Sequence, residues 1–265
     1  MSKNSIDNRK KLVALRHTNF QKNLSLNHQL IDLVRDIDSH AFLTNPASQN
    51  IFLYLTEYVR AVLEYWFGTS LDKVRVLDWG CGKGHISFLM REMGVQITSC
   101  DVGGGGDSAF NQITPIIEKA PLKVVPLEHL YLLPFSDASF DVVLSFGVLE
   151  HVPNDLASLG EIHRVLKPSG LFFCFFLPYY LSWTQNLAHL RGDFYHDRLY
   201  SQKMVKNLLK QTNFELLDFW HRQLLPKNSV SYPKYHVFES VDQWLTTNTP
   251  LKYTATNIEF VAVKS

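Results

Sequence analysis

One short stretch of the chain combines a carboxylate with a glycine-rich turn. The residues VLDWGCGKG at 76–84 run from apolar positions into Asp78 and then into Gly80, Gly82 and Gly84. Glycines at alternating positions let the backbone turn sharply from a strand into a helix and let a ligand approach the main chain closely. The carboxylate at the mouth of the turn decides which ligands are compatible with it.

Two phosphate-binding patterns fit this turn poorly. A P-loop needs Ser or Thr after its Gly-Lys pair, but Lys83 is followed by Gly84. A dinucleotide turn has the spacing G-x-G-x-x-G, and here the third glycine comes one residue early. S-adenosylmethionine carries an ammonium and a sulfonium but no phosphate, so Asp78 could attract its positive end, directly or through water. A ligand-free turn and a dinucleotide-dependent oxidoreductase stay open as alternatives.

A second acid follows at the spacing that nucleotide-binding α/β folds use for a ribose. The apolar stretch VQITSCD ends at Asp101, and in such folds the ribose acid comes roughly 20 residues after the turn. Two carboxylate oxygens suit the two adjacent hydroxyls of a ribose. The alternative is that Asp101 only caps the next loop, which contains the glycines at 103–106.

At these motifs the sequence resembles the class I S-adenosylmethionine-dependent methyltransferases, and it is most similar to the branch with the ubiquinone- and menaquinone-biosynthesis enzymes. The resemblance rests on VLDWGCGKG (76–84), SCD (99–101), LPFSDASFDVVLSFGVLEHV (133–152) and EIHRVLKPSGLFF (161–173). It implies an α/β, Rossmann-like, seven-stranded and mostly parallel sheet of order 3-2-1-4-5-7-6, with an antiparallel last strand and helices on both faces. It also implies S-adenosyl-L-methionine as cofactor and in-line methyl transfer to a small-molecule acceptor, by O- or C-methylation.

The resemblance assigns the candidate cofactor residues to parts of the ligand. The glycine turn would surround the methionine part, and the acid after the second strand would bind the ribose. Adenine would lie on the residue after that acid and near one of three residues before LPF. The full set is Asp78, Gly80, Cys81, Gly82 and Gly84 for the turn, Asp101 for the ribose, Val102, Glu128, His129 and Leu130 for the adenine, and Ser145 and Phe146 near the methyl.

The motif VLEHV at 148–152 offers a second group of reactive side chains. A neutral His151 could act as a general base toward a hydroxyl or an activated carbon acid, or it could form a structural pair with Glu150. In one related group of quinone O-methyltransferases a Glu-x-x-Glu-His cluster binds a divalent metal. Gly147 stands at the first acidic position here, so we expect no metal.

Contacts to the acceptor are expected from an insertion around 178–200 and from the N-terminal helices. The insertion concentrates aromatic, His and Arg residues, and His196 and Arg198 are its candidate acceptor contacts, against the alternative of an ordinary packed insertion. The fourth strand ends in SFGV rather than in the Asp/Asn-Pro-Pro-Tyr/Phe of DNA base-amine methylation. With a net charge of +1, this predicts no nucleic-acid partner.

The elements that must position these residues alternate along the chain, as in α/β folds. Residues 1–70 are predicted to form an N-terminal helical extension that is a candidate lid, and residues 71–265 are predicted to form the methyltransferase domain. Within the extension, we expect one helix from Asn27 and a second helix with Ser48 as its N-cap. A later helix has Asn154 as its predicted N-cap and a Pro-Ser-Gly stop. The predicted strands lie at 73–80, 95–101, 122–128, 140–147, 171–177, 215–220 and 257–265.

Composition sets the remaining expectations. The chain has 265 residues, of which 46% are hydrophobic and 19% charged, so a sizeable core is expected. Cys81, Cys100 and Cys174 have no metal or disulfide spacing and indicate a reducing compartment, from which we expect a cytoplasmic protein. No apolar h-region begins the chain, and the most apolar stretch, 171–183, is too short to span a bilayer.

We therefore expect no signal peptide and no integral membrane association, and oligomeric state is left without a prediction. The rival to an active enzyme is a catalytically silent S-adenosylmethionine-binding module of the same fold that acts as a partner or regulatory subunit.

Overall fold

The strands form one seven-stranded sheet with the order β3-β2-β1-β4-β5-β7-β6. The computed structural model describes residues 3–18, 20, 26, 29–30, 32, 46–102, 120, 122–192, 196, 198–225 and 235–265. β7 runs antiparallel to both of its neighbours, and the other neighbouring strands are parallel. The predicted class, strand order and antiparallel last strand are confirmed. The strands are β1 (Arg75–Trp79), β2 (Gln96–Val102), β3 (Val124–Leu127), β4 (Phe140–Phe146), β5 (Leu166–Pro178), β6 (Phe214–Arg222) and β7 (Asn257–Lys264).

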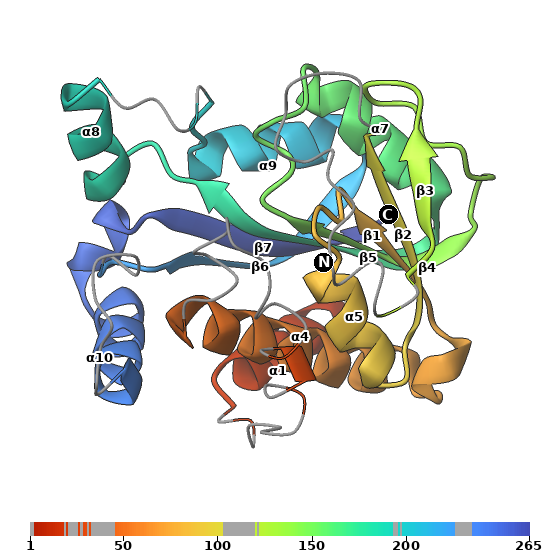
Figure 1. Ribbon diagram of the computed structural model, residues 1–265, viewed down its shortest axis with the longest axis horizontal. Coiled ribbons are helices and arrows are strands. Elements are labelled where there is room, and N and C mark those ends of the chain that lie inside the picture. Colours follow the sequence, from red (N-terminus) through yellow and green to blue (C-terminus); the bar gives the residue numbers. More distant parts are fainter. Residues whose placement is uncertain are drawn as a thin grey trace.

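Helices cover both faces of the sheet, as Figure 1 shows. α1, α4 and α5 lie below the sheet in that view, and α7 and α9 lie above it. α8 and α10 both lie at the end of the molecule that is far from β3, with α8 above the sheet and α10 below it in that view. The helices are α1 (Lys3–Arg16), α4 (Pro46–Phe67), α5 (His85–Glu92), α7 (Asp155–Val165), α8 (Trp183–Leu190), α9 (Gln202–Gln211) and α10 (Tyr235–Asn248), with short 3-10 turns at η1 (Leu71–Lys73) and η2 (Pro250–Thr254).

The described residues form two apolar core clusters, one on each face of the sheet. Successive residues of a strand point to opposite faces, so Val142 and Phe173 join the cluster under α4 and α5, whereas Val143 and Phe172 join the cluster under α7 and α9. A central strand buried on both faces reads as an unbroken apolar run, which explains the sequence LFFCFF in β5.

The N-terminal helices pack into the same core as the sheet. Leu55, Val59 and Val62 of α4 are fully buried there. The Nε atom of Arg16, at the end of α1, lies 2.9 Å from Oδ2 of Asp218 in β6, and its guanidinium lies 4.9 Å from the Trp220 ring centroid. These contacts fix α1 and α4 on one face of the sheet.

The structure corrects several predicted boundaries. α4 begins at Pro46, so Ser48 is a buried residue of its first turn and not its N-cap. Asn154 is confirmed as an N-cap, because its side chain accepts a hydrogen bond from the Ala157 amide. The Pro-Ser-Gly sequence lies inside β5, which already begins at Leu166.

The reason for this last difference is a local irregularity in the strand. Ser169 has φ +62°, and a Cβ on Gly170 would lie 2.8 Å from the Lys167 carbonyl oxygen. Pairing between β4 and β5 shifts register at the same place, so the sequence forms a bulge rather than a stop. α1, α8 and α10 were not predicted, and the helix predicted from Asn27 lies mostly outside the described residues.

Candidate cofactor and acceptor site

Three parallel strands end side by side at one edge of the sheet. In the register of the sheet, Trp79 at the end of β1 lies opposite Cys100 of β2 and Ser145 of β4. The residues that follow these strands therefore emerge together, at the edge where such sheets bind ligands. This places the glycine turn, Asp101 and the loop after Phe146 next to one another.

The glycine turn is held to β2 by its own backbone. The amides of Gly80 and Cys81 donate to the Cys100 carbonyl oxygen at 2.9 and 3.0 Å. Gly80 has φ +71°, and a Cβ there would lie 2.6 Å from Cγ2 of Val148. Gly82 has φ +51° but faces open space, with no atom within 4 Å of an added Cβ. Gly80 is therefore required by packing within the protein, and Gly82 leaves room for a ligand.

Asp78 lies beneath the turn and is only 1% exposed. Its Oδ2 accepts a hydrogen bond of 2.6 Å from the Ser87 hydroxyl, which in turn lies 2.7 Å from Oγ of Ser99. Burial raises the pKa of Asp78 to about 7, and the neighbouring charge of Asp101 contributes to this rise. The side chain thus faces α5 and the interior, so it would act on a cationic ligand through its charge rather than through a direct hydrogen bond.

Asp101 is fixed directly against the turn. Its Oδ2 accepts the Gly82 amide at 2.5 Å and its Oδ1 accepts the Val102 amide at 2.7 Å. Burial raises the pKa of this carboxyl. Each carboxylate oxygen can accept a second hydrogen bond, so the group is oriented and still able to take the two hydroxyls of a ribose. Val102, which is 53% exposed, lies beside it with an open apolar surface.

The predicted adenine residues begin where β3 ends. Val102 is paired with Leu127 in the sheet, so Glu128, His129 and Leu130 follow close to it. The Nδ1 atom of His129 accepts hydrogen bonds from the amides of Tyr131 and Leu132, at 3.3 and 3.1 Å. His129 therefore shapes its own turn, while Glu128 and Leu130 have exposed side chains.

The end of β4 differs between its two predicted residues. Ser145 is fully buried beside Cys174 of β5. Phe146 is half-buried, and its ring centroid lies 4.6 Å from that of Phe175. Phe146 therefore lies at the rim of the site and Ser145 in the interior.

Sequence reasoning missed an aromatic group next to this rim. The ring of His85, the first residue of α5, lies 4.4 Å from that of Phe52 in α4, and Phe52 also contacts Phe176. Burial lowers the pKa of His85 to about 3, so this imidazole is neutral. Phe176 has φ +61° within a register shift of β5, a bulge that could not be read from the apolar run.

Three titratable groups meet on the acceptor side of the rim. One ligand atom each from Glu150, His151 and His196 lie within 4.8 Å of one another. Nε2 of His151 is 3.9 Å from Oε1 of Glu150, and the two imidazole centroids are 5.4 Å apart. Burial raises the pKa of Glu150 to about 8, so this carboxyl keeps its proton at neutral pH. The His151 side chain is 55% exposed.

Arg198 connects the insertion to the loop after β4. It donates to the carbonyl oxygens of Val152 and Pro153, at 2.9 and 3.3 Å. The Tyr200 hydroxyl donates to the Leu149 carbonyl oxygen at 3.2 Å. The predicted acceptor residue Arg198 thus binds the protein's own backbone, and His196 of the same insertion lies next to His151.

The residues at the strand ends fit S-adenosylmethionine. Asp78 and Asp101 lie close together at the turn, and within the described part of the chain no basic side chain lowers the pKa of either carboxyl. A cation bound at the mouth of the turn would compensate this negative charge. The open space at Gly82 and the oriented Asp101 provide room for the ligand and a partner for its ribose.

Comparisons with known proteins agree with this arrangement. Residues 77–174 match the family described as "Methyltransferase domain". Over 117 residues the chain is 32% identical to a ubiquinone biosynthesis O-methyltransferase of Maricaulis maris, covering 41% of this chain and 44% of that protein. Over 103 residues it is 34% identical to a tRNA U34 carboxymethyltransferase of Nautilia profundicola, covering 38% of this chain and 33% of that one. The chain thus matches less than half the length of these curated relatives.

Solved structures share the fold. A putative sarcosine dimethylglycine methyltransferase from Galdieria sulphuraria superposes with a TM-score of 0.58 at 19% identity, over 91% of this chain and 98% of that one. A SAM-dependent methyltransferase from Archaeoglobus fulgidus gives a TM-score of 0.51 at 20% identity, over 79% of this chain and 94% of that one.

Among the described helices, none is long and apolar enough to cross a membrane. The match of residues 77–174 and the shared fold together support a class I S-adenosylmethionine-dependent methyltransferase domain, a family that implies S-adenosylmethionine as the cofactor.

Proposed function

We propose that this protein transfers the methyl group of S-adenosylmethionine to a hydroxyl or an activated carbon of a small-molecule acceptor. The observation that carries the proposal is the pairing of Asp101 with the Gly82 amide, at a turn that is open beside Gly82. The acceptor would approach from the side of His151 and His196, across the rim formed by Phe146.

In this proposal the bound cofactor supplies an electrophilic methyl group on a sulfonium, and the chain supplies position and a base. Holding nucleophile, methyl carbon and sulfur in line contributes much of the rate. The exposed imidazole of His151 accepts the proton of the acceptor hydroxyl as the oxygen becomes the nucleophile. Oε1 of Glu150 lies 3.9 Å from Nε2 of His151, so the imidazolium formed in this step would favour the ionised form of that carboxyl.

A small-molecule acceptor is favoured by charge and by the surroundings of the site. The net charge is +1, which provides little of the positive surface that binds a nucleic-acid backbone. Aromatic residues line the rim. The name of one relative includes ubiquinone biosynthesis and that of another includes tRNA, so a tRNA belongs in the acceptor panel as the competing class.

Calorimetry with S-adenosylmethionine and with S-adenosylhomocysteine tests the proposal directly. We expect both to bind at micromolar concentration. Failure of both to bind at high micromolar concentration would overturn the cofactor assignment. Binding without transfer to any member of a broad acceptor panel would favour the second candidate, a silent binding module that acts as a partner or regulatory subunit.

Replacing the buried acid of the turn tests the choice of ligand. We expect Asp78→Ala to abolish S-adenosylmethionine binding, because the negative charge under the turn is lost, while the chain still folds. Circular dichroism checks the fold. If this variant kept or gained affinity for NAD, the dinucleotide alternative would replace our proposal.

Replacing the proposed base tests the chemistry. We expect His151→Ala to lower turnover by about a hundredfold, in the range of general-base catalysis, while the cofactor affinity stays as in the wild type. Unchanged turnover would give His151 a structural role only.

The remaining sequence predictions are part of the proposal. We propose that residues 1–70 contribute to closing the acceptor side, that His196 contacts the acceptor, and that the protein works without a metal. A cytoplasmic location is supported by three free, buried cysteines, a pattern of reducing compartments.

A further inference from the structure

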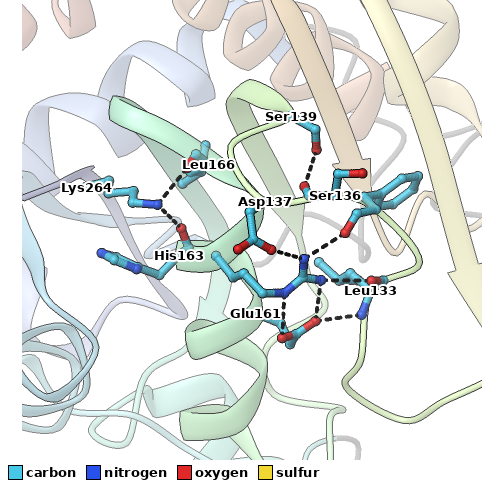
Figure 2. A network of polar contacts seen from close by, with 10 residues as sticks. Leu133, Ser136, Asp137, Ser139, Glu161, His163, Leu166 and Lys264 are labelled. Atoms are coloured by element: carbon cyan, nitrogen blue, oxygen red, sulfur yellow. Dashed lines mark hydrogen bonds and ion pairs between the residues drawn. The ribbon is translucent and has the colours of Figure 1, made fainter.

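The segment between β3 and β4 forms the adenine side of the proposed site, and its backbone is held by a helix on one face of the sheet. Residues 128–139 contain no helix or strand. Two side chains of α7, Glu161 and Arg164, bind this segment, and Figure 2 shows Glu161 beside Leu133. Contacts from α7 therefore fix the backbone conformation of this segment.

Arg164 binds two carbonyl groups of the segment with its planar guanidinium. Nη1 donates to the Phe135 carbonyl oxygen at 2.7 Å, and Nη2 donates to the Leu133 carbonyl oxygen at 2.9 Å. Nε and Nη2 also donate to Oε1 and Oε2 of Glu161, at 2.9 and 2.8 Å. This fork requires arginine, because a lysine ammonium cannot present parallel donors in one plane.

Glu161 completes the arrangement from the other side. Its Oε2 accepts the Leu133 amide at 3.0 Å, so the pair fixes both the N–H and the C=O of one residue. The hydrogen bonds from Arg164 lower the pKa of Glu161 and keep it ionised. Leu133 is itself buried, so the backbone has little freedom left at this point.

The fixed backbone of Leu133 is connected to the residues that would contact the adenine. The amide next to Leu133, that of Leu132, donates to Nδ1 of His129 at 3.1 Å. The turn at 128–132 is thereby tied to the point that Arg164 and Glu161 hold.

From this geometry we infer that Arg164 and Glu161 are positioning residues for the adenine side of the cofactor site. The inference rests on the proposed function, since the ligand is the proposed cofactor. Without the pair the turn at 128–132 samples other arrangements, and the apparent affinity falls by the fraction of time spent in the binding arrangement.

The test compares Arg164→Lys and Glu161→Gln with the wild type. Arg164→Lys keeps the net charge and removes the fork. We expect each variant to bind S-adenosylhomocysteine about tenfold more weakly, which corresponds to a tenth of the population in the binding arrangement. In the ligand-free proteins we expect faster hydrogen exchange at the amides of Leu132 and Leu133.

Two matched controls come from the same network in Figure 2. Asp137 pairs with Arg164 at 2.8 Å through a side chain that is 79% exposed, so Asp137→Asn should change little. Lys264 donates to the carbonyl oxygens of His163 and Leu166, both at 2.7 Å, at the end of α7. Lys264→Met should lower the melting temperature without changing the affinity.

The outcomes separate the inference from the proposed function. Wild-type affinity and wild-type exchange in Arg164→Lys would overturn the inference. An equal loss of affinity in Lys264→Met would also overturn it, since general loosening of α7 would then explain the effect. If the wild type bound no cofactor, the proposed function would fall, and the exchange of Leu132 and Leu133 would still decide whether the pair orders this segment.

Discussion

The cofactor side and the acceptor side of the proposed site are built differently. On the cofactor side, the backbone bonds of Gly80 and Cys81 and the carboxylate of Asp101 join strand ends that are neighbours in the sheet. On the acceptor side, Arg198 and Tyr200 reach carbonyl groups of a loop that is distant in sequence. The first arrangement follows from the register of the sheet. The second depends on a few side chains, so it can change between related proteins without loss of the fold.

The largest expected effect concerns the glycine that separates the two sides. In Gly80→Ala the new methyl group would overlap Val148 of the acceptor-side loop, and the residue would keep φ +71°. We expect a loss of about 3 kcal/mol in the free energy of unfolding, the sum of overpacking and backbone strain, together with loss of cofactor binding. Urea unfolding and calorimetry measure the two effects.

Gly82→Ala is the matched control for this glycine. It has space for a methyl group, so it should cost only the strain of a positive φ, about 1 kcal/mol, yet weaken cofactor binding strongly. Equal losses of stability in the two variants would contradict the difference in their surroundings.

The next effect tests the buried charge on the cofactor side. The pKa of Asp78 is raised from 3.8 to about 7, so between these values the native state binds a proton that the unfolded chain has released. Stability of the wild type therefore falls as the pH rises through this window. Relative to Asp78→Asn, we expect the wild type to lose about 2 kcal/mol between pH 5 and pH 7. Urea unfolding at both pH values checks this, and parallel pH curves would show that the carboxyl does not titrate in this range.

A smaller effect is expected on the acceptor side. Arg198→Lys removes the paired bonds to Val152 and Pro153, so the loop that carries His151 should exchange its amide hydrogens severalfold faster. Cofactor affinity should stay unchanged, because the glycine turn makes no contact with this arginine among the described hydrogen bonds. Mass spectrometry of exchange and calorimetry give the two readings. A matching loss of cofactor affinity would mean that the two sides are not independent.

The smallest expected effect is none at all. We expect extended dialysis against a chelator to leave cofactor binding and turnover unchanged, since Gly147 replaces the first acid of the metal-binding pattern. Glu150, His151 and His196 bring their ligand atoms within 4.8 Å of one another, so they are the residues that this experiment examines. Restoration of activity by added zinc or manganese would overturn the prediction and give the acceptor side a different chemistry.

Much of the cofactor side could be predicted because its requirements are local. A turn with Gly80, Gly82 and Gly84 and an acid at the next strand end are visible in the sequence, since backbone conformation and strand register place them. The acceptor side could not be predicted in this way. The hydrogen bond from Arg198 to the Val152 carbonyl oxygen joins two segments that are distant in the sequence. No known spacing between residues predicts such a contact.

Errors in the predicted elements have related causes. Gly170 lies in a bulge where an added Cβ would meet the carbonyl oxygens of Lys167 and Asp141, although Pro-Ser-Gly is a common end signal for a helix. The burial of Asp78 against Ser87 needed the position of α5. Local sequence patterns thus predicted the presence of an element or of an acidic site residue. The contacts that each of them makes depend on tertiary packing.

The position of β7 has a consequence for how the chain acquires its fold. β7 lies between β5 and β6, although its residues come after those of every other strand. During synthesis, the edges of β5 and β6 that face β7 stay unpaired until residues 257–264 have been made. Unpaired strand edges are sites of aggregation. Completion of the sheet is therefore a long-range event that follows the synthesis of all its other strands, and Lys264 at the end of β7 then binds the end of α7.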